Sequence, residues 1–220
     1  MKEKKIIITG GLGFLGFSIF KKLINENYVL VIDNLSSNII EKKFVTNNKN
    51  GTFCELNITN NSIIEIIEQY NPDIVIHCAA QTNVIESMKN PIKTKNINIE
   101  GTRNILESIK NLVNCYFVFL SSGGAIYGEP KYLPVDENHE KNPISNYGIS
   151  KLKGELLTKN ILSQSKINYS IIRPSNIYGP GQKTENVIPK FIKLMKMKQE
   201  VRIFGDGSSS RDYIYIDDLV

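Results

Sequence analysis

Two side chains four residues apart could carry out acid–base chemistry in this sequence. Tyr147 and Lys151 stand at positions i and i+4 of a helical stretch, so both lie on one helix face, about one turn apart. A free tyrosine has a pKa near 10, too high for a base at neutral pH. A nearby ammonium and a positively charged nicotinamide would both favour the phenolate and lower that pKa. The pair therefore suits proton removal from an alcohol during hydride transfer.

A glycine-rich turn near the start of the chain could bind the diphosphate of a dinucleotide. Gly10, Gly13 and Gly16 follow the apolar run 6–8 with the spacing G-x-x-G-x-x-G and open a helical stretch. Glycine is needed because the chain turns sharply and its backbone must approach the pyrophosphate without a Cβ in the way. The N–H groups that begin the helix then point at the anion. The alternative is a glycine turn and helix cap that bind no ligand.

An acidic residue follows this turn at the spacing that a dinucleotide site requires. Asp33 ends the second apolar run, 20 residues after Gly13, where a carboxylate can accept both ribose hydroxyls of an adenosine. It would repel the 2′-phosphate of NADP by on the order of 4 kcal/mol, for charges about 4 Å apart at an effective dielectric near 20. The sequence therefore predicts a preference for NAD over NADP.

Two adjacent hydroxyls form a third candidate feature. Ser121 and Ser122 come directly after the apolar run 116–120. The carboxyl ends of strands form the ligand-binding edge of an open α/β sheet, so these hydroxyls would face the same site. The alternative is a serine-rich loop without a ligand.

Apolar runs alternate with helical stretches in a way that would position these residues. The strand candidates are 5–8, 28–32, 52–56, 74–78, 116–120 and 169–172, and the amphipathic segments are 14–26, 61–70, 93–111, 145–164 and 187–198. Apolar strands separated by helices predict a parallel sheet covered on both faces. Right-handed crossovers then give a doubly wound, Rossmann-like α/β fold.

The character of the sequence changes near Gly179, where loop-forming stretches such as 178–181 and 204–210 begin. We interpret residues 1–175 as an NAD-binding domain of Rossmann type. Residues 176–220 would be the start of a smaller region, truncated at Val220 just after a helix begins at Asp217 and Asp218.

Composition bounds the class of protein. The 220 residues carry a net charge of +5, with 41% hydrophobic and 22% charged residues, which is typical of a globular protein. The lysines are scattered, which argues against nucleic-acid binding. The sequence contains no run of about 18 apolar residues, so we expect no membrane-spanning helix. Cys54, Cys78 and Cys115 form no C-x-x-C pair, so we expect reduced thiols in a cytoplasmic protein and no metal site.

Together these motifs resemble the extended short-chain dehydrogenase/reductase superfamily and, within it, the NAD-dependent epimerase/dehydratase family, with the UDP-glucose 4-epimerase type closest. The matching positions run through the chain in the family's order: 9–16, 33–34, 77–81, 98, 101–102, 121–122, 147–151, 173–181 and 211–213.

The resemblance implies NAD as the cofactor and a UDP-sugar as the substrate, and it makes residues 176–220 the start of a sugar-nucleotide-binding region. The implied cofactor-binding residues are Gly10, Gly13, Phe14 and Leu15 at the pyrophosphate, Asp33 and Asn34 at the ribose, Asn57 and Ile58 near adenine, Ala79, Ala80, Gln81 and Asn98 along the cleft, and Ser121, Tyr147, Lys151, Pro174 and Ser175 toward the nicotinamide. Tyr147 would be the catalytic base and Lys151 its partner. Asn176 and Arg211 would contact the substrate diphosphate, which suits a guanidinium fork. A homodimer would form through the helices at 93–111 and 145–164.

The sequence departs from the family pattern at two places. Asn57 stands where an acidic residue often contacts adenine, and an amide can still form a hydrogen bond there. Gly123 stands where the family has its catalytic serine or threonine, so Ser122 or a water would supply that hydroxyl and contact the substrate. The related 4,6-dehydratases place Asp and Glu at the next two positions, here Gly124 and Ala125, and neither of these carries a proton.

The sequence therefore predicts a nucleotide-sugar 4-epimerase, of UDP-glucose or UDP-N-acetylglucosamine type, that regenerates its NAD through a 4-keto intermediate. One alternative is another NAD-dependent nucleotide-sugar reductase or dehydrogenase, which net consumption of cofactor would reveal. The other is an inactive NAD-binding fragment. The sequence does not name the sugar.

Overall fold

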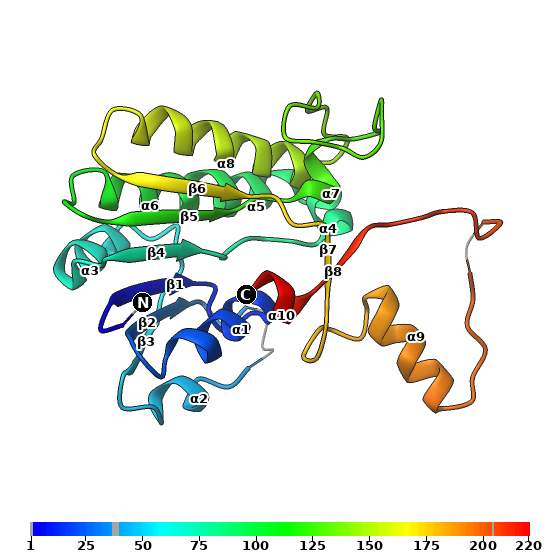
Figure 1. Ribbon diagram of the computed structural model, residues 1–220, viewed down its shortest axis with the longest axis horizontal. Coiled ribbons are helices and arrows are strands. Elements are labelled where there is room, and N and C mark those ends of the chain that lie inside the picture. Colours follow the sequence, from blue (N-terminus) through cyan, green and yellow to red (C-terminus); the bar gives the residue numbers. More distant parts are fainter. Residues whose placement is uncertain (1, 37–39, 204) are drawn as a thin grey trace.

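Six parallel strands form one sheet in the order β3-β2-β1-β4-β5-β6 (Figure 1). The computed structural model describes residues 2–36, 40–203 and 205–220. The strands are β1 (Lys5–Thr9), β2 (Tyr28–Asp33), β3 (Gly51–Glu55), β4 (Ile74–His77), β5 (Tyr116–Leu120) and β6 (Asn168–Ile172). The strand order reverses between β1 and β4, as in doubly wound dinucleotide-binding folds. The predicted Rossmann-like fold is confirmed.

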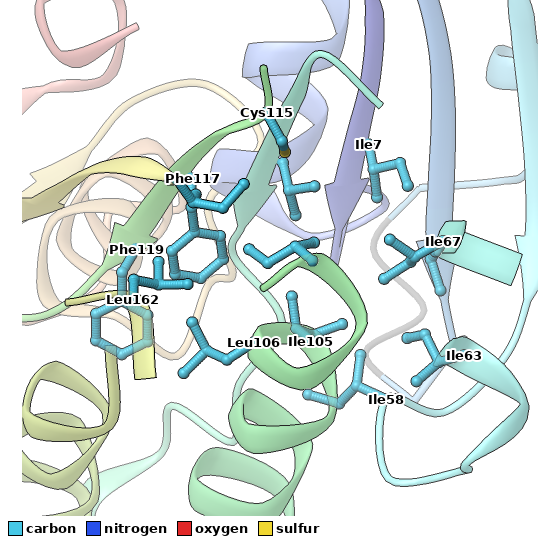
Figure 2. Close-up of a cluster of buried hydrophobic side chains, with 14 of the residues drawn as sticks. Ile7, Ile58, Ile63, Ile67, Ile105, Leu106, Cys115, Phe117, Phe119 and Leu162 are labelled. Carbon is cyan, nitrogen blue, oxygen red and sulfur yellow. The ribbon is translucent and has the colours of Figure 1, made fainter. Parts of the chain in front are cut away.

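Alternate residues of the strands enter two separate hydrophobic clusters. Ile7 belongs to the larger cluster, which α3 (Ser62–Tyr70), α6 (Gly101–Ile109) and α8 (Asn146–Leu162) complete (Figure 2). Ile6 and Ile8 belong to the other, which α1 (Phe14–Leu23) and α2 (Lys43–Thr46) complete. This alternation follows the period of two along a strand. The edge strand β6 is less buried by the helices, and its Ile172 is 36% exposed. The expected burial of both sheet faces therefore holds only for the inner strands.

The helix predicted at 93–111 has three parts. A π-helical turn, η1 (Asn96–Glu100), separates α5 (Pro91–Lys95) from α6. Such turns are frequent at functional sites. Three short helices, α2, α4 (Val84–Lys89) and α7 (Gly123–Ile126), were not predicted from the sequence.

A second small sheet follows the first. β7 (Asn176–Tyr178) and β8 (Tyr213–Tyr215) pair in parallel, and α10 (Ile216–Leu219) continues from β8 to lie near α1. The sequence did not predict these strands. Between them, α9 (Val187–Lys196) has no buried residue and stands apart from the large sheet (Figure 1).

Two further predictions from the sequence concern the loop 204–210 and membrane-spanning helices. Residue 204, which begins the predicted loop 204–210, lies outside the described residues, and 205–210 contain no helix or strand. Within the ranges described above, no helix combines the length and the apolar character needed to cross a bilayer.

Candidate active site

The glycine turn lies between the end of β1 and the start of α1, at the edge where the strand order reverses. Gly10 has a φ of +67°, and a Cβ on it would lie 2.7 Å from the backbone of Ala79. A Cβ on Gly16 would collide with the carbonyl oxygen of Gly10. Both positions therefore require glycine.

The start of α1 is open to an anion. Gly13 is the N-cap and offers no side chain to the helix, so the N–H groups of Phe14 and Leu15 lack helical acceptors. An anion placed there would meet these donors and the positive end of the helix dipole. The turn thus fits the diphosphate of a dinucleotide.

Asp33 stands at the end of β2 beside this turn and is only 7% exposed. Its two carboxylate oxygens accept hydrogen bonds from the backbone N–H groups of Leu12, at 3.0 Å, and Leu35, at 2.8 Å. Each oxygen has a second lone pair. The carboxylate is therefore held at the turn and can still accept hydroxyl groups.

The residues expected near adenosine differ in whether their side chains lie in turns or in the core. Asn34 and Asn57 each accept a hydrogen bond within their own turn, at 3.1 Å from the N–H groups of Ser36 and Thr59. The side chain of Ile58 is instead buried in the large cluster and packs on Gly101. Only the backbone of Ile58 could face a cofactor.

Asn98 connects the loop after β4 to α8, the helix that carries Tyr147 and Lys151. Its side chain exchanges two hydrogen bonds with the backbone of Gln81, at 2.7 and 2.9 Å, and donates another to Ser150 Oγ at 2.9 Å. Ser150 Oγ in turn donates to the carbonyl oxygen of Tyr147 at 2.7 Å. Ala79 and Ala80 lie on the same loop, so this network fixes the cleft against the first turn of α8.

Lys151 is buried at the centre of the site. It is 4% exposed, and its ammonium donates to the carbonyl oxygen of Leu120, at the end of β5, at 2.7 Å. Burial lowers its pKa to about 8, although the neighbouring Cys78 opposes this shift. Its helix, α8, begins after the N-cap Ser145, whose Oγ accepts a hydrogen bond from the N–H of Gly148 at 3.0 Å.

Tyr147 has a raised pKa in this structure, which corrects one expectation. Its burial raises the pKa above the usual value, and hydrogen bonding with Ser122 lowers it. Lys151 is not among the groups that shift the pKa of Tyr147, and its ammonium donates to the Leu120 carbonyl instead. The side chain that supports the phenolate here is Ser122.

The loop after β5 explains why glycine occupies position 123. The N–H of Gly123 donates to the carbonyl oxygen of Pro174 at 2.9 Å. A Cβ on Gly123 would lie 2.9 Å from the carbonyl oxygen of Arg173 and 3.2 Å from that of Pro174. The loop is therefore packed directly on the end of β6, and Ser122 is the residue that interacts with Tyr147.

The small sheet brings the two expected diphosphate ligands into one region. Asn176 donates from its amide to the carbonyl oxygen of Asp212 at 3.0 Å, next to Arg211. Arg211 is exposed and donates to the carbonyl oxygen of Ser210 at 2.6 Å. A Cβ on Gly124 would lie 3.8 Å from the Asn176 amide oxygen, so this region adjoins the Ser122 loop.

Two buried polar residues near the site, Glu155 and His77, were not given a role from the sequence. Glu155 is 1% exposed and pairs with Arg173 in a bidentate ion pair. Its spacing of four from Lys151 was the available signal. His77 is buried between the hydroxyls of Thr9, at 2.7 Å, and Thr102, at 2.9 Å. Its place at the end of an apolar strand gave no sign of this.

This geometry puts the protein in the short-chain dehydrogenase/reductase class of dinucleotide-dependent enzymes. The model of the NAD dependent epimerase/dehydratase family matches residues 6–220. The chain belongs to that family, whose cofactor is NAD, and the glycine turn and Asp33 fit that cofactor.

Relatives and solved structures of this family resemble the chain over almost its whole length. A protein from Methanocaldococcus jannaschii named "Putative UDP-glucose 4-epimerase" is 44% identical over 97% of this chain and 70% of its own. A dTDP-D-glucose 4,6-dehydratase from Dictyostelium discoideum is 36% identical over 99% of this chain, which spans 54% of that protein. The structure of a UDP-N-acetylglucosamine 4-epimerase from Methanobrevibacter ruminantium matches with a TM-score of 0.92 and 33% identity, over 100% of this chain and 71% of that one.

Proposed function

We propose that the protein is a nucleotide-sugar 4-epimerase that acts on UDP-glucose or UDP-N-acetylglucosamine. The carrying observation is a tyrosine that interacts with Ser122 and shares its helix face with Lys151, beside a loop whose positions 124 and 125 bear no ionisable group. Elimination of water from a sugar needs an added acid and base, whereas epimerisation needs a single proton acceptor at the C4 hydroxyl. The site supplies that acceptor as Tyr147.

Residues 1–175 would hold the cofactor and residues 176–220 would contribute to the sugar-nucleotide side. The glycine turn and the start of α1 would bind the NAD diphosphate, and Asp33 the adenosine ribose. NAD, when bound, would supply the hydride acceptor and donor for oxidation and reduction at C4. Tyr147 Oη takes the proton of the C4 hydroxyl and returns it, so the 4-keto sugar is transient. The Ser122 hydroxyl would orient the phenolate, and Lys151, one helical turn from Tyr147, would hold the nicotinamide ribose. Asn176 and Arg211 would contact the substrate diphosphate.

Proton NMR of the purified chain with NAD and each UDP-sugar tests this proposal. We expect the 4-epimer to form without accumulation of NADH. The Tyr147→Phe variant should lose turnover, because the base is removed while the ring is kept. Tyr28→Phe, at a position 52% exposed on β2, is the matched control and should retain it. Net NADH formation would identify a dehydrogenase instead, and NAD binding without conversion would contradict the epimerase proposal.

We also propose that the chain pairs as a homodimer through η1, α6 and α8. These elements border a surface groove lined by Lys95, Ile99, Glu100, Arg103, Lys153, Leu156, Leu157 and Asn160. Leu156 is 50% exposed on it, and apolar side chains at such a position favour burial against a partner. Analytical ultracentrifugation should find a dimer that Leu156→Glu weakens. A monomer at micromolar concentration would contradict the proposal.

We infer a reducing, cytoplasmic setting for the protein. The three cysteines are free, and burial raises the pKa of the Cys78 and Cys115 thiols to about 12. Unpaired thiols of this kind are typical of reducing compartments. Fractionation of the native cells, with detection by antibody, would test the location.

A further inference from the structure

One buried carboxylate joins the catalytic helix to the ends of two strands. Glu155, on α8, accepts a hydrogen bond from Ser121 Oγ at 2.6 Å, just after β5. It also accepts from Arg173, just after β6, through Nε at 2.8 Å and a terminal nitrogen at 2.7 Å. Three charge-assisted hydrogen bonds therefore converge on a side chain that is 1% exposed.

Glu155 lies on the same helix as the proposed base and its partner. Tyr147, Lys151 and Glu155 follow one another at intervals of four residues on α8, so each side chain lies about one turn beyond the last. Any side chain that binds Glu155 is therefore fixed relative to Tyr147 on the same helix.

Arg173 extends this link to the loop that carries the proposed hydroxyl. Its other terminal nitrogen donates to the hydroxyl of Tyr127 at 2.9 Å and to the carbonyl oxygen of Glu137 at 3.2 Å. Its own carbonyl oxygen, with that of Pro174, forms the surface on which Gly123 packs. The ion pair thus fixes the backbone on both sides of Ser122.

We propose that Glu155 and Arg173 are positioning residues that hold the Ser122 hydroxyl against Tyr147. The proposal rests on the proposed role of Tyr147 as base. A buried ion pair gains little stability over apolar side chains of similar volume, because desolvation offsets the attraction. Positioning of the site explains the ion pair better than stability does, since a misplacement of about 1 Å in a reacting group can cost about a hundredfold in rate.

Four variants separate positioning from plain folding. Glu155→Gln keeps the size of the side chain and an acceptor for Ser121 but removes the charge that orients Arg173. Ser121→Ala removes one hydrogen bond, and Arg173→Lys keeps the charge but loses the fork. Glu26→Gln, whose partner Lys2 is 74% exposed, removes a surface ion pair away from the site and serves as the control.

We expect Glu155→Gln to lower kcat by about tenfold or more, with the KM and the NAD dissociation constant within about twofold of wild type. Ser122 would lose its position, so the pKa of Tyr147 would rise. The acid limb of the kcat–pH profile would then move to higher pH, because the phenolate is the active form. Ser121→Ala and Arg173→Lys should shift it in the same direction by less, and Glu26→Gln should not shift it.

A second readout does not depend on turnover. The tyrosinate absorbance of each variant is titrated against the same variant carrying Tyr147→Phe, so the difference reports the pKa of Tyr147 alone. A higher value in Glu155→Gln supports positioning even if the chain has another activity. Unchanged values, with activity lost only in proportion to folded protein, would overturn the proposal. If Glu155→Gln does not fold, unchanged profiles in both Ser121→Ala and Arg173→Lys would overturn it.

Discussion

Replacement of Lys151 by methionine should change how the stability of the protein depends on pH. Methionine approximates the aliphatic stem but carries no proton. Burial lowers the pKa of Lys151 from 10.5 to about 8. The folded protein therefore holds this proton less tightly than the unfolded chain does.

The magnitude follows from these two pKa values. Between about pH 8 and pH 10.5 the unfolded chain binds more protons than the folded protein, so the free energy of unfolding rises with pH. Below about pH 8 both states are protonated and the penalty for burying the ammonium is fully present. Titration between the two values gives the wild type a gain of about 2 kcal/mol from about pH 7 to about pH 9.5, which Lys151→Met lacks.

Urea denaturation of both proteins at these two pH values measures this difference. Groups that titrate in both proteins cancel in the comparison. Lys22→Met, on the exposed side of α1, should show the same pH response as wild type. If wild type and Lys151→Met changed in parallel with pH, the argument that the lysine is buried at an energetic cost would be refuted. Lys151→Met should also lose turnover, because it removes the ammonium that would hold the nicotinamide ribose.

Three further changes test the surrounding groups. Asp33→Ser should weaken NAD binding and shift the NAD/NADP affinity ratio by at least about tenfold toward NADP, as measured by titration of reduced-cofactor fluorescence; an unchanged ratio would contradict the role of the carboxylate. Burial lowers the pKa of His77 to about 3, and the unfolded chain takes up its proton below about pH 6.5. Acidification from about pH 7.5 to about pH 5 should therefore cost wild type about 2 kcal/mol of unfolding free energy more than His77→Gln, and equal losses in urea titrations would count against it. Gly123→Ser should destabilise the fold by about 1–3 kcal/mol, because its Cβ meets two carbonyl oxygens; an unchanged melting temperature would show that the loop adapts.

The parts of the site that the sequence predicted are those built from neighbouring residues. The glycine spacing defines a turn, Asp33 ends an apolar strand, and a helical interval of four places Tyr147 and Lys151 on one face. The inner strands of the large sheet were visible because each is an apolar run with both faces inside the protein.

The parts that could not be predicted depend on contacts between distant residues. Each strand of the small sheet has three residues, and β7 and β8 are separated by α9 and long loops, so no local pattern marks their pairing. The contact that Lys151 makes could not be predicted for the same reason. The lysine lies on α8, and the carbonyl of Leu120 that accepts its hydrogen bond ends β5, 31 residues earlier in the chain.

The glycine at position 123 follows from packing at the end of β6. Because Gly123 rests on the carbonyl oxygens of Arg173 and Pro174, a side chain there has no room, and the hydroxyl that interacts with Tyr147 comes from Ser122 instead. Ser122 is extended and caps α7, so its direction is set by the backbone at the end of β5. The following residues of α7 are glycine and alanine. In the proposed mechanism, the N-cap of this short helix would supply the hydroxyl beside the base, and its next positions lack the acid and base that dehydration needs.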